Sequence, residues 1–272
     1  TVKEGEYRPE QARMAVNEAL RKGDVTEACR ALDVFLGQLD RESWPITEPY
    51  CWQVDEISNI TCLEREVLLT MRVQNEKVVL HLFSPFPNCI RLHADPVGFF
   101  DARPSVPLIY THVEDGVNAQ FGDLTVEIRH DWSITVKDSE RIRWQLTDVD
   151  FAFSGHRSYL LRLPLADNEA IYGFGERFDA VNQRGRVITV HDLDAWEGTI
   201  YGLRNQQYKP IQLFHSTAGY TLFLNSTYRL RADVGQGQPG RLRLTQDGPI
   251  FDLYLWACEP LEALKGYTEL TG

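Results

Sequence analysis

Side chains able to carry chemistry gather in one acidic segment of this sequence. His191, Asp192, Asp194 and Trp196 occur within one short stretch. Two carboxylates beside an imidazole could bind a polar ligand or move a proton. In a loop, however, aspartates most often accept hydrogen bonds from their own backbone, and a lone histidine is usually a hydrogen-bonded polar group. The residues alone leave both interpretations open.

The rest of the sequence carries no familiar catalytic or cofactor motif. There is no G-x-S-x-G, P-loop or C-x-x-C element, so nothing favours a triad hydrolase, a nucleotide-binding protein or a redox enzyme. The seven histidines have neither H-x-H nor H-x-x-x-H spacing. Because zinc sites usually show such spacing, we expect no metal and no cofactor.

Charge and hydrophobicity exclude two classes of partner. The net charge is −11, and a nucleic-acid partner would require a surface rich in lysine and arginine. The densest basic cluster alternates with leucines, as on the solvated face of two strands: Arg229, Arg231, Arg241 and Arg243. No apolar run approaches the roughly 18 residues of a membrane span. We therefore expect no nucleic-acid partner and no membrane partner.

Cysteine usage favours the cytoplasm. The five cysteines are odd in number and lack paired spacing, which indicates buried free thiols in a reducing compartment. The first residue is Thr1, so a removed leader and secretion stay open as the alternative. In a secreted chain the sequons at Asn59 and Asn225 would become relevant.

From about Trp52 the hydrophobic pattern has a period of two. Strand-like runs are 67–73, 77–83, 124–129, 133–137, 142–146, 159–163, 212–215, 220–224, 228–232, 241–245 and 251–255. Turn pairs such as Asp115-Gly116, Gly122-Asp123 and Asp247-Gly248 separate many of them. Many short strands without intervening helices predict a mainly β fold, a large antiparallel β-sandwich over residues 46–258.

Helical patterns flank the predicted sandwich. Residues 1–45 contain two amphipathic runs that Gly23 separates, which predicts an N-terminal α-helical hairpin. The second run has an apolar stripe, and one hypothesis is that it joins two copies in a homo-oligomer. Residues 259–272 predict a short C-terminal helix with Leu261, Leu264 and Tyr267 as its apolar stripe. We interpret this helix as a connector to a further domain.

A series of short elements in fixed order carries a family resemblance. The elements are Tyr172-Gly173-Phe174-Gly175-Glu176-Arg177-Phe178, Asn182-Gln183-Arg184-Gly185, Asp192-Leu193-Asp194, Pro210-Ile211, Gly219-Tyr220-Thr221-Leu222-Phe223-Leu224-Asn225 and Tyr267-Thr268-Glu269-Leu270-Thr271-Gly272. Over roughly residues 60–272 this series resembles the N-terminal domain of glycoside hydrolase family 31, the α-glucosidase and α-xylosidase family. Each element alone would be weak, but their order makes chance an unlikely source.

The resemblance implies both a fold and a function. It implies a galactose-mutarotase-like sandwich that precedes a (β/α)₈ barrel, with both catalytic aspartates on that barrel. This chain would then hold no catalytic residue and would be inactive alone. Its acidic loop would reach the sugar pocket of the parent α-glycosidase, where Asp194 aligns with a sugar-contacting aspartate. A shifted alignment selects Asp192, which stands where the family has asparagine.

Other roles remain open for these residues and for the whole chain. Trp196 could offer a face to a pyranose ring or be a buried anchor. We expect Glu176 and Arg177 to form a structural ion pair or network under the loop. A free-standing carbohydrate-binding module is the first alternative function. An aldose epimerase is the second, and it would require a general acid and base facing one sugar.

Overall fold

The computed structural model describes residues 17–23, 52–53, 56–73, 76–94, 104–139, 141–152, 158–177, 180–191, 209–248 and 250–272. The chain divides into two compact units, Thr1–Glu48 and Pro49–Gly272. In the first unit residues 17–21 are helical, and Gly23 follows with a φ of 70°. This turn lies within the predicted helical hairpin, whose other residues are outside the described part of the chain.

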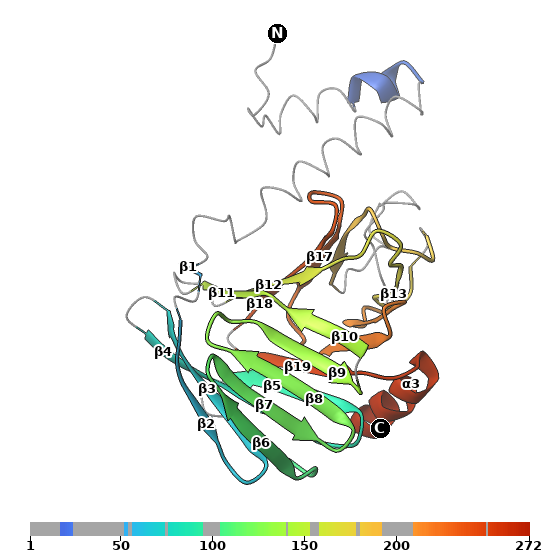
Figure 1. The fold of residues 1–272 in the computed structure, drawn as a ribbon. Helices are drawn as coiled ribbons and strands as arrows, with labels where there is room; N and C mark the ends of the chain where they lie inside the picture. The colour runs from blue at the N-terminus through green and yellow to red at the C-terminus, as the bar shows by residue number, and fades with distance from the viewer. Residues whose placement is uncertain are drawn as a thin grey trace. The chain divides into compact units, whose positions relative to one another are not determined.

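The second unit consists of three sheets in which every strand pairing is antiparallel (Figure 1). The eight-stranded sheet runs in the order β13 (Ile171–Gly173), β15 (Leu213–Ser216), β16 (Tyr220–Leu224), β19 (Phe251–Trp256), β5 (Cys89–Ala94), β4 (Glu76–Phe83), β3 (Glu66–Val73) and β2 (Glu56–Cys62). The five-stranded sheet runs β10 (Arg141–Leu146), β9 (Ile134–Asp138), β8 (Leu124–Arg129), β7 (Gly116–Phe121) and β6 (Leu108–Val113). The six-stranded sheet runs β1 (Trp52–Gln53), β11 (Asp148–Ala152), β12 (Ser158–Pro164), β18 (Arg241–Asp247), β17 (Leu230–Val234) and β14 (Val187–Val190). The predicted mainly β antiparallel fold is confirmed.

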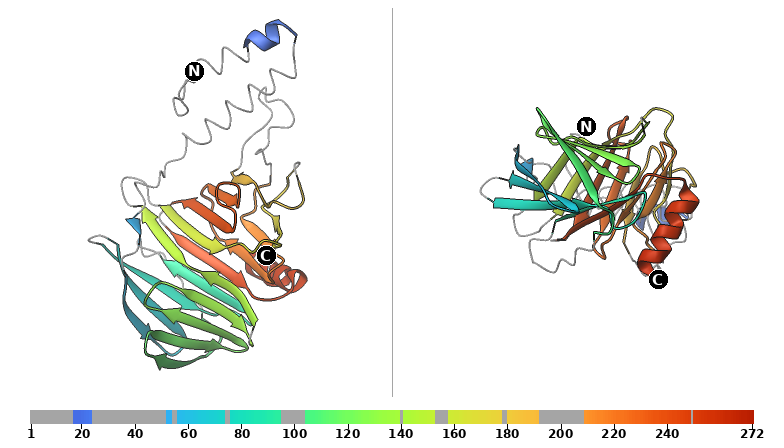
Figure 2. Two further views of the ribbon diagram at one scale, coloured as in Figure 1. Left: turned by 45° about the horizontal axis from the view of Figure 1, so that its top comes forward. Right: turned by 60° about the horizontal axis from the view of Figure 1, so that its bottom comes forward.

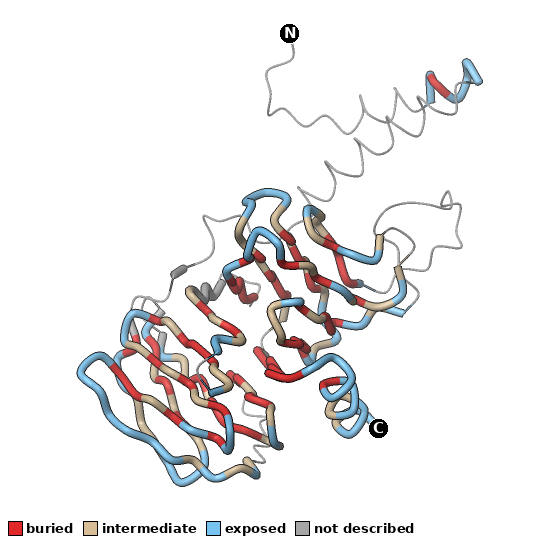
Figure 3. Tube along the Cα trace, turned by 45° about the vertical axis from the view of Figure 1, so that its right-hand side comes forward, coloured by how far each residue is buried: buried red, intermediate tan, exposed pale blue. Residues whose placement is uncertain are grey.

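One apolar core joins the three sheets. Buried and more exposed residues alternate along strands such as β8, because successive side chains point to opposite faces (Figure 3). The core cluster takes side chains from all three sheets. Across it, the rings of Tyr159 on β12 and Phe251 on β19 lie 5.2 Å apart. Each such buried side chain stabilises the fold by about 1.5–3 kcal/mol.

Two strands, β5 and β7, are not predicted by the hydrophobic pattern of the sequence, and the structure shows why. On β5, Arg91 and His93 alternate with apolar residues, but they are largely buried rather than solvated. Strand β7 contains Asn118, Ala119 and Gln120, which have little β propensity. Both strands are fixed by their neighbours in the sheet. Tertiary pairing therefore outweighs local preference here.

The C-terminal helix α3 (Pro260–Thr271) buries a different face from the predicted one. Leu261 and Leu264 are exposed, at 76% and 40%, so the predicted stripe is wrong at these two positions. Ala263 is buried, and Tyr267 and Leu270 pack beside it on a cluster that includes Trp256. Figure 2 shows α3 as the red helix at the C-terminal end of the chain, and it contacts β16 of the eight-stranded sheet. None of the helices in the described part of the chain is long and apolar enough to cross a membrane.

The described cysteines are free thiols. Cys89 and Cys258 are buried, and Cys62 is partly buried. Burial raises the pKa of Cys89 well above its ordinary value, with a further rise from the neighbouring Cys258. Burial, and then Glu262 and Glu259, raise the pKa of Cys258 to about 12. Both thiols are thus protonated at neutral pH and act as small packing groups.

Gly266 allows α3 to lie directly on Trp256. A Cβ at position 266 would clash with the indole nitrogen and lie 3.1 Å from Trp256 Cε2. Gly266→Ala should therefore lower the free energy of unfolding by about 1–3 kcal/mol, although alanine has the higher helix propensity by about 1 kcal/mol. Denaturant titration measures this change. Lys265→Ala, at an exposed neighbouring position, is the control, and equal stability of the two variants would contradict the packing argument.

Candidate functional site

The predicted sugar-contacting residues lie outside the described residues. Asp192, Asp194 and Trp196 belong to the segment 192–208, of which only the two flanking ends are described. His191, exposed, follows β14, which is the edge strand of the six-stranded sheet. Lys209 precedes β15, which pairs with β13, the edge strand of the eight-stranded sheet. In the chain, the segment therefore lies between β14, at the edge of one sheet, and β15, the second strand of another sheet that shares the same core.

Two glycines let the chain pass close to residues 209–214, which follow this segment in the sequence. Gly173 and Gly175 have φ values of 129° and 85°, a backbone region that favours glycine. A Cβ on Gly173 would lie 2.6 Å from the Leu213 carbonyl oxygen. A Cβ on Gly175 would lie 2.7 Å from the Ile211 nitrogen. The G-x-G pattern thus produces a close backbone approach that holds the start of β15.

Backbone hydrogen bonds confirm this approach. The Phe174 N–H donates to the Leu213 carbonyl at 2.8 Å, and the Glu176 N–H donates to the Lys209 carbonyl at 3.2 Å. The Phe174 ring is buried and stacks on Phe214, with ring centres 4.8 Å apart. Glu176 also lies 3.8 Å from the Lys209 ammonium, but both side chains are well exposed. This ion pair contributes less than about 1 kcal/mol.

The Asn182–Gly185 turn links a strand of the eight-stranded sheet to a strand of the six-stranded sheet. The Asn182 side-chain oxygen accepts hydrogen bonds from the Ile171 and Arg184 backbone N–H groups, at 3.2 and 3.0 Å. The Gly185 N–H donates to the Val234 carbonyl at 2.7 Å. Ile171 is on β13 and Val234 on β17, so this turn links the eight-stranded to the six-stranded sheet. The Asn182-Gln183-Arg184-Gly185 element of the family series thus has a structural role.

A buried carboxylate holds β15 and β16 together at the corner of the domain beside β13. Glu169 accepts hydrogen bonds from the Ser216 hydroxyl, from the Tyr220 hydroxyl at 3.1 Å and from the Ala166 N–H at 3.0 Å. Arg184 donates to the Glu169 carbonyl at 2.8 Å. Burial raises the pKa of Tyr220 well above its ordinary value, and the Glu169 carboxylate raises it further. The phenol therefore stays a donor to Glu169.

A second polar cluster lies on the face of the eight-stranded sheet that points away from the main core. Arg91 donates to both carboxylate oxygens of Asp252, at 2.7 and 2.9 Å. His93 Nδ1 lies 3.2 Å from Asp252 Oδ1, and Asn225 donates to Oδ2 at 2.8 Å. The Arg91 guanidinium lies 4.9 Å from the centre of the Tyr254 ring. Sequence analysis missed this cluster, because its members come from strands far apart in the chain.

The cluster around Asp252 is built for structure rather than proton transfer. Asp252 and His93 are 3% and 4% exposed. Burial raises the pKa of Asp252, but hydrogen bonds from His93 and Arg91, together with the Arg91 charge, outweigh burial and set the pKa below its ordinary value. A carboxylate that is ionised, buried and fully engaged cannot face a sugar as a general base. Among the described residues there is also no group of three metal-ligating side chains that could hold an ion.

Comparison with known proteins identifies the fold and the motif series. The model of the glycosyl hydrolase 31 N-terminal galactose mutarotase-like domain matches residues 82–233. The chain belongs to this family. The resemblance inferred from the ordered motifs is thereby confirmed, and so is the mutarotase-like sandwich.

Relatives of this family 31 domain are much longer proteins. It is 30% identical over 112 residues to the α-xylosidase XylQ of Lactiplantibacillus pentosus, a match covering 41% of this chain and 14% of the xylosidase. It is 29% identical over 138 residues to an α-xylosidase of Emericella nidulans, a match covering 50% of this chain and 17% of that enzyme. The matches thus span less than a fifth of each relative's length.

Solved structures agree on the architecture. The cycloalternan-forming enzyme of Listeria monocytogenes, solved with a pentasaccharide substrate, superposes with a TM-score of 0.74 at 17% identity. The superposition covers 82% of this chain and 22% of that enzyme. At this identity the likeness establishes the fold of the family 31 domain and does not extend to its ligand.

Comparing alanine substitutions at two glycines distinguishes the cost of backbone strain from the cost of a steric clash. The two glycines have similar backbone angles, but only one has close neighbours. Gly175 and Gly185 have φ values of 85° and 77°, but a Cβ on Gly185 meets nothing within 4 Å. Both alanine variants bear the cost of the left-handed backbone, which is about 1–2 kcal/mol. Gly175→Ala should lose at least about 1 kcal/mol more, because Lys209 and Ile211 must move. Unfolding curves give both values, and hydrogen exchange at Ile211 should rise in Gly175→Ala alone.

The Asp252 cluster should dominate the charge-dependent stability of the domain. Asp252→Asn should lower the free energy of unfolding by about 3 kcal/mol, because it leaves the buried Arg91 charge uncompensated. Asp247→Asn is the matched control. It breaks a more exposed ion pair with Arg229, 3.2 Å long, and should lose less than about 1 kcal/mol.

The pH dependence of the stability difference between wild type and Asp252→Asn is a further test of the role of the Asp252 carboxylate. Since the folded-state pKa of Asp252 is lowered, its stabilisation is fully present at neutral pH and is lost as the pH falls through that lowered value. The gap between wild type and Asp252→Asn should shrink below about pH 4. A gap that stays constant down to acid unfolding would contradict the assignment.

Proposed function

We propose that this chain is the non-catalytic N-terminal β-sandwich domain of a retaining α-glycosidase and contributes the segment around 192–196 to the sugar pocket of its parent enzyme. The reacting carboxylates would belong to a (β/α)₈ barrel in the same polypeptide. An α-linked oligosaccharide or glucoside is the expected substrate of the parent. The α-xylosidases among its relatives extend this expectation to α-xylosides.

The observation that carries the proposal is the fixing of both ends of the segment 192–208. Val190, one residue before His191, is buried on β14. At the other end, Lys209 and Ile211 lie against the Gly175 backbone. A loop anchored on two sheets can present a side chain at low entropic cost, which is what a binding pocket requires.

Within this segment we assign the sugar contact to Asp194. A carboxylate accepts hydrogen bonds from two hydroxyl groups, and in a partly desolvated cleft such charge-assisted bonds are about twice as strong as neutral ones. Trp196 would add an apolar face for a pyranose ring. Asp192 takes the role of Asp194 if the alignment is shifted.

Substitutions in the full-length parent enzyme test this assignment. Asp194→Asn should lower kcat/KM for an α-glucoside or α-xyloside by about 10–100-fold, the loss of one charge-assisted hydrogen bond. Asp192→Asn should change it by less than about threefold, which is within the range of surface substitutions. Asp123→Asn, in an exposed turn between β7 and β8, controls for general effects of a lost carboxylate.

Each outcome of this experiment has a distinct meaning. A loss confined to Asp192→Asn selects the shifted alignment. No loss in either variant rejects the sugar-contacting role of the segment. A reading frame that contains no barrel sequence after Gly272 rejects the parent enzyme itself.

Binding by the isolated chain separates this function from a free-standing binding module. One wall of a pocket should bind sugars only weakly, because ligand sites usually bury most of the ligand surface. Calorimetry with malto- and isomalto-oligosaccharides should therefore give no affinity tighter than about 1 mM for the isolated chain. Tighter binding would favour the module, and measurable interconversion of sugar anomers would instead favour an epimerase.

A further inference from the structure

Five of the six edge strands in the described sheets are short or irregular. Strands β1, β13 and β14 have two, three and four residues. Strand β2 has a register shift between Ile57 and Asn59, and β10 has one between Ile142 and Trp144. Short length and bulges are common ways in which proteins prevent edge-to-edge pairing.

Strand β6 is the exception. It has six residues, pairs with β7 in unbroken register and contains no lysine, arginine, proline or glycine. Five consecutive residues, Ile109 to Val113, are exposed. No other described strand pairs with its free edge. An exposed, regular and uncharged edge is a template for another strand.

The hydrogen-bond pattern shows which backbone groups of β6 face outward. The Leu108 N–H donates away from β7, to the Glu64 carbonyl at 3.4 Å. Since backbone direction alternates along a strand, the N–H and C=O groups of Tyr110 and His112 also point away from β7. Both residues are exposed. They provide two donors and two acceptors for an additional strand.

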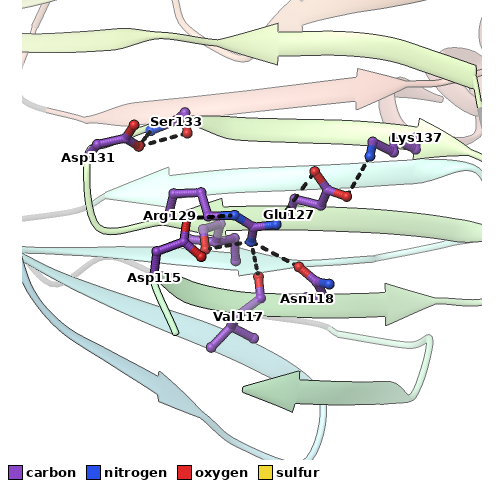
Figure 4. Close-up of polar contacts among 9 residues, drawn as sticks. Asp115, Val117, Asn118, Glu127, Arg129, Asp131, Ser133 and Lys137 are labelled. Atoms are coloured by element: carbon purple, nitrogen blue, oxygen red, sulfur yellow. Dashed lines mark hydrogen bonds and ion pairs between the residues drawn. The ribbon is translucent and has the colours of Figure 1, made fainter. Parts of the chain in front are cut away.

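The outer face of the five-stranded sheet changes character at β6. On β7 to β9 it is covered by paired polar groups (Figure 4). Arg129 donates to Asn118 at 2.9 Å and lies 3.6 Å from Glu127, which in turn pairs with Lys137 at 2.5 Å. On β6 the same face presents Ile109, Thr111 and Val113, with Ile109 67% exposed. Apolar side chains at a free edge are unusual without a partner.

We propose that β6 is a self-association surface, on which a second copy of this chain pairs β6 to β6 in antiparallel orientation about a two-fold axis. With Thr111 opposite Thr111 of the second copy, Tyr110 faces His112 and exchanges both backbone hydrogen bonds with it. Ile109 then lies opposite Val113 on the outer face. Between positions 109 and 113 this register places no two like charges opposite each other, and Thr–Thr, aromatic and aliphatic pairs are favourable ones. The two five-stranded sheets become one continuous sheet, and the interface is closed by symmetry.

The second copy is the occupant that this register favours, because the strand is complementary to itself. The net charge of −11 on each copy opposes the association. Since salt screens such repulsion beyond about 10 Å, the dimer should be more stable at about 0.5 M salt than at low salt. An interface held by ion pairs would show the opposite dependence.

Sedimentation of the full 272-residue chain tests the proposal. The wild type should pass from monomer to dimer as its concentration rises. Thr111→Lys places two lysines opposite each other on the two-fold axis and should weaken the dimer by about tenfold or more. Gln120→Lys is the matched control, since Gln120 is exposed on the same face of the neighbouring strand but away from the edge. It should leave the dimer unchanged.

A second variant removes backbone donors without adding charge. Tyr110→Pro deletes one outward N–H in each copy and leaves the pairing to β7 intact, because proline is tolerated on the free side of an edge strand. It should also weaken the dimer, while circular dichroism confirms the fold. A wild type that stays monomeric at all concentrations overturns the proposal. Equal association of Thr111→Lys and Gln120→Lys also overturns it, and assigns the dimer to another surface.

Discussion

Positions 173 and 175, at and just after the end of β13, have no room for a side chain. Gly173 and Gly175 bring their backbone so close to residues 209–214 that a Cβ at either position would overlap backbone atoms. The strand pairing of β13 with β15, the stacking of Phe174 on Phe214 and the position of Lys209 all follow from this approach. The corner of the domain where residues 173–176 meet residues 209–214 is therefore held by backbone packing, and the exposed Glu176–Lys209 ion pair adds little.

Polar groups complete that corner instead of weakening it. Glu169 is buried but accepts three hydrogen bonds, and Asn182 and Gly185 link β13 of one sheet to β17 of another. The Asp252 cluster plays the same part on the far face of the eight-stranded sheet, where Arg91 and Asn225 saturate the carboxylate. Buried polar networks of this kind are costly unless every member is satisfied, and when satisfied they select one arrangement of strands. Such networks therefore fix the described strands on either side of the segment 192–208 in the chain.

Family membership and local geometry answer different questions about this domain. The family model and the solved relatives establish a mutarotase-like sandwich of glycoside hydrolase 31. The two described His–carboxylate pairs, His81 with Glu66 and His93 with Asp252, could have suggested acid–base chemistry. The Asp252 carboxylate is nevertheless saturated by Arg91, His93 and Asn225, and it is almost inaccessible to solvent. Geometry thus shows the Asp252 cluster to be structural, which its residue types alone would not.

Local sequence determined the fold class and the family. Period-two alternation in strands such as β3, β4 and β8 reflects burial of one face, and the order of the Gly175, Asn182 and Asn225 elements identified the family without any coordinates. Tertiary structure decided which faces pack and which polar residues meet. The helix α3 buries Ala263 and packs the partly buried Tyr267 beside it, not Leu261, and Gly266 leaves room for the contact with Trp256. Arg91 and Asp252 are 161 positions apart in the chain, and only the pairing of β5 with β19 makes them neighbours, because sheet register is set by the whole core and not by any short segment.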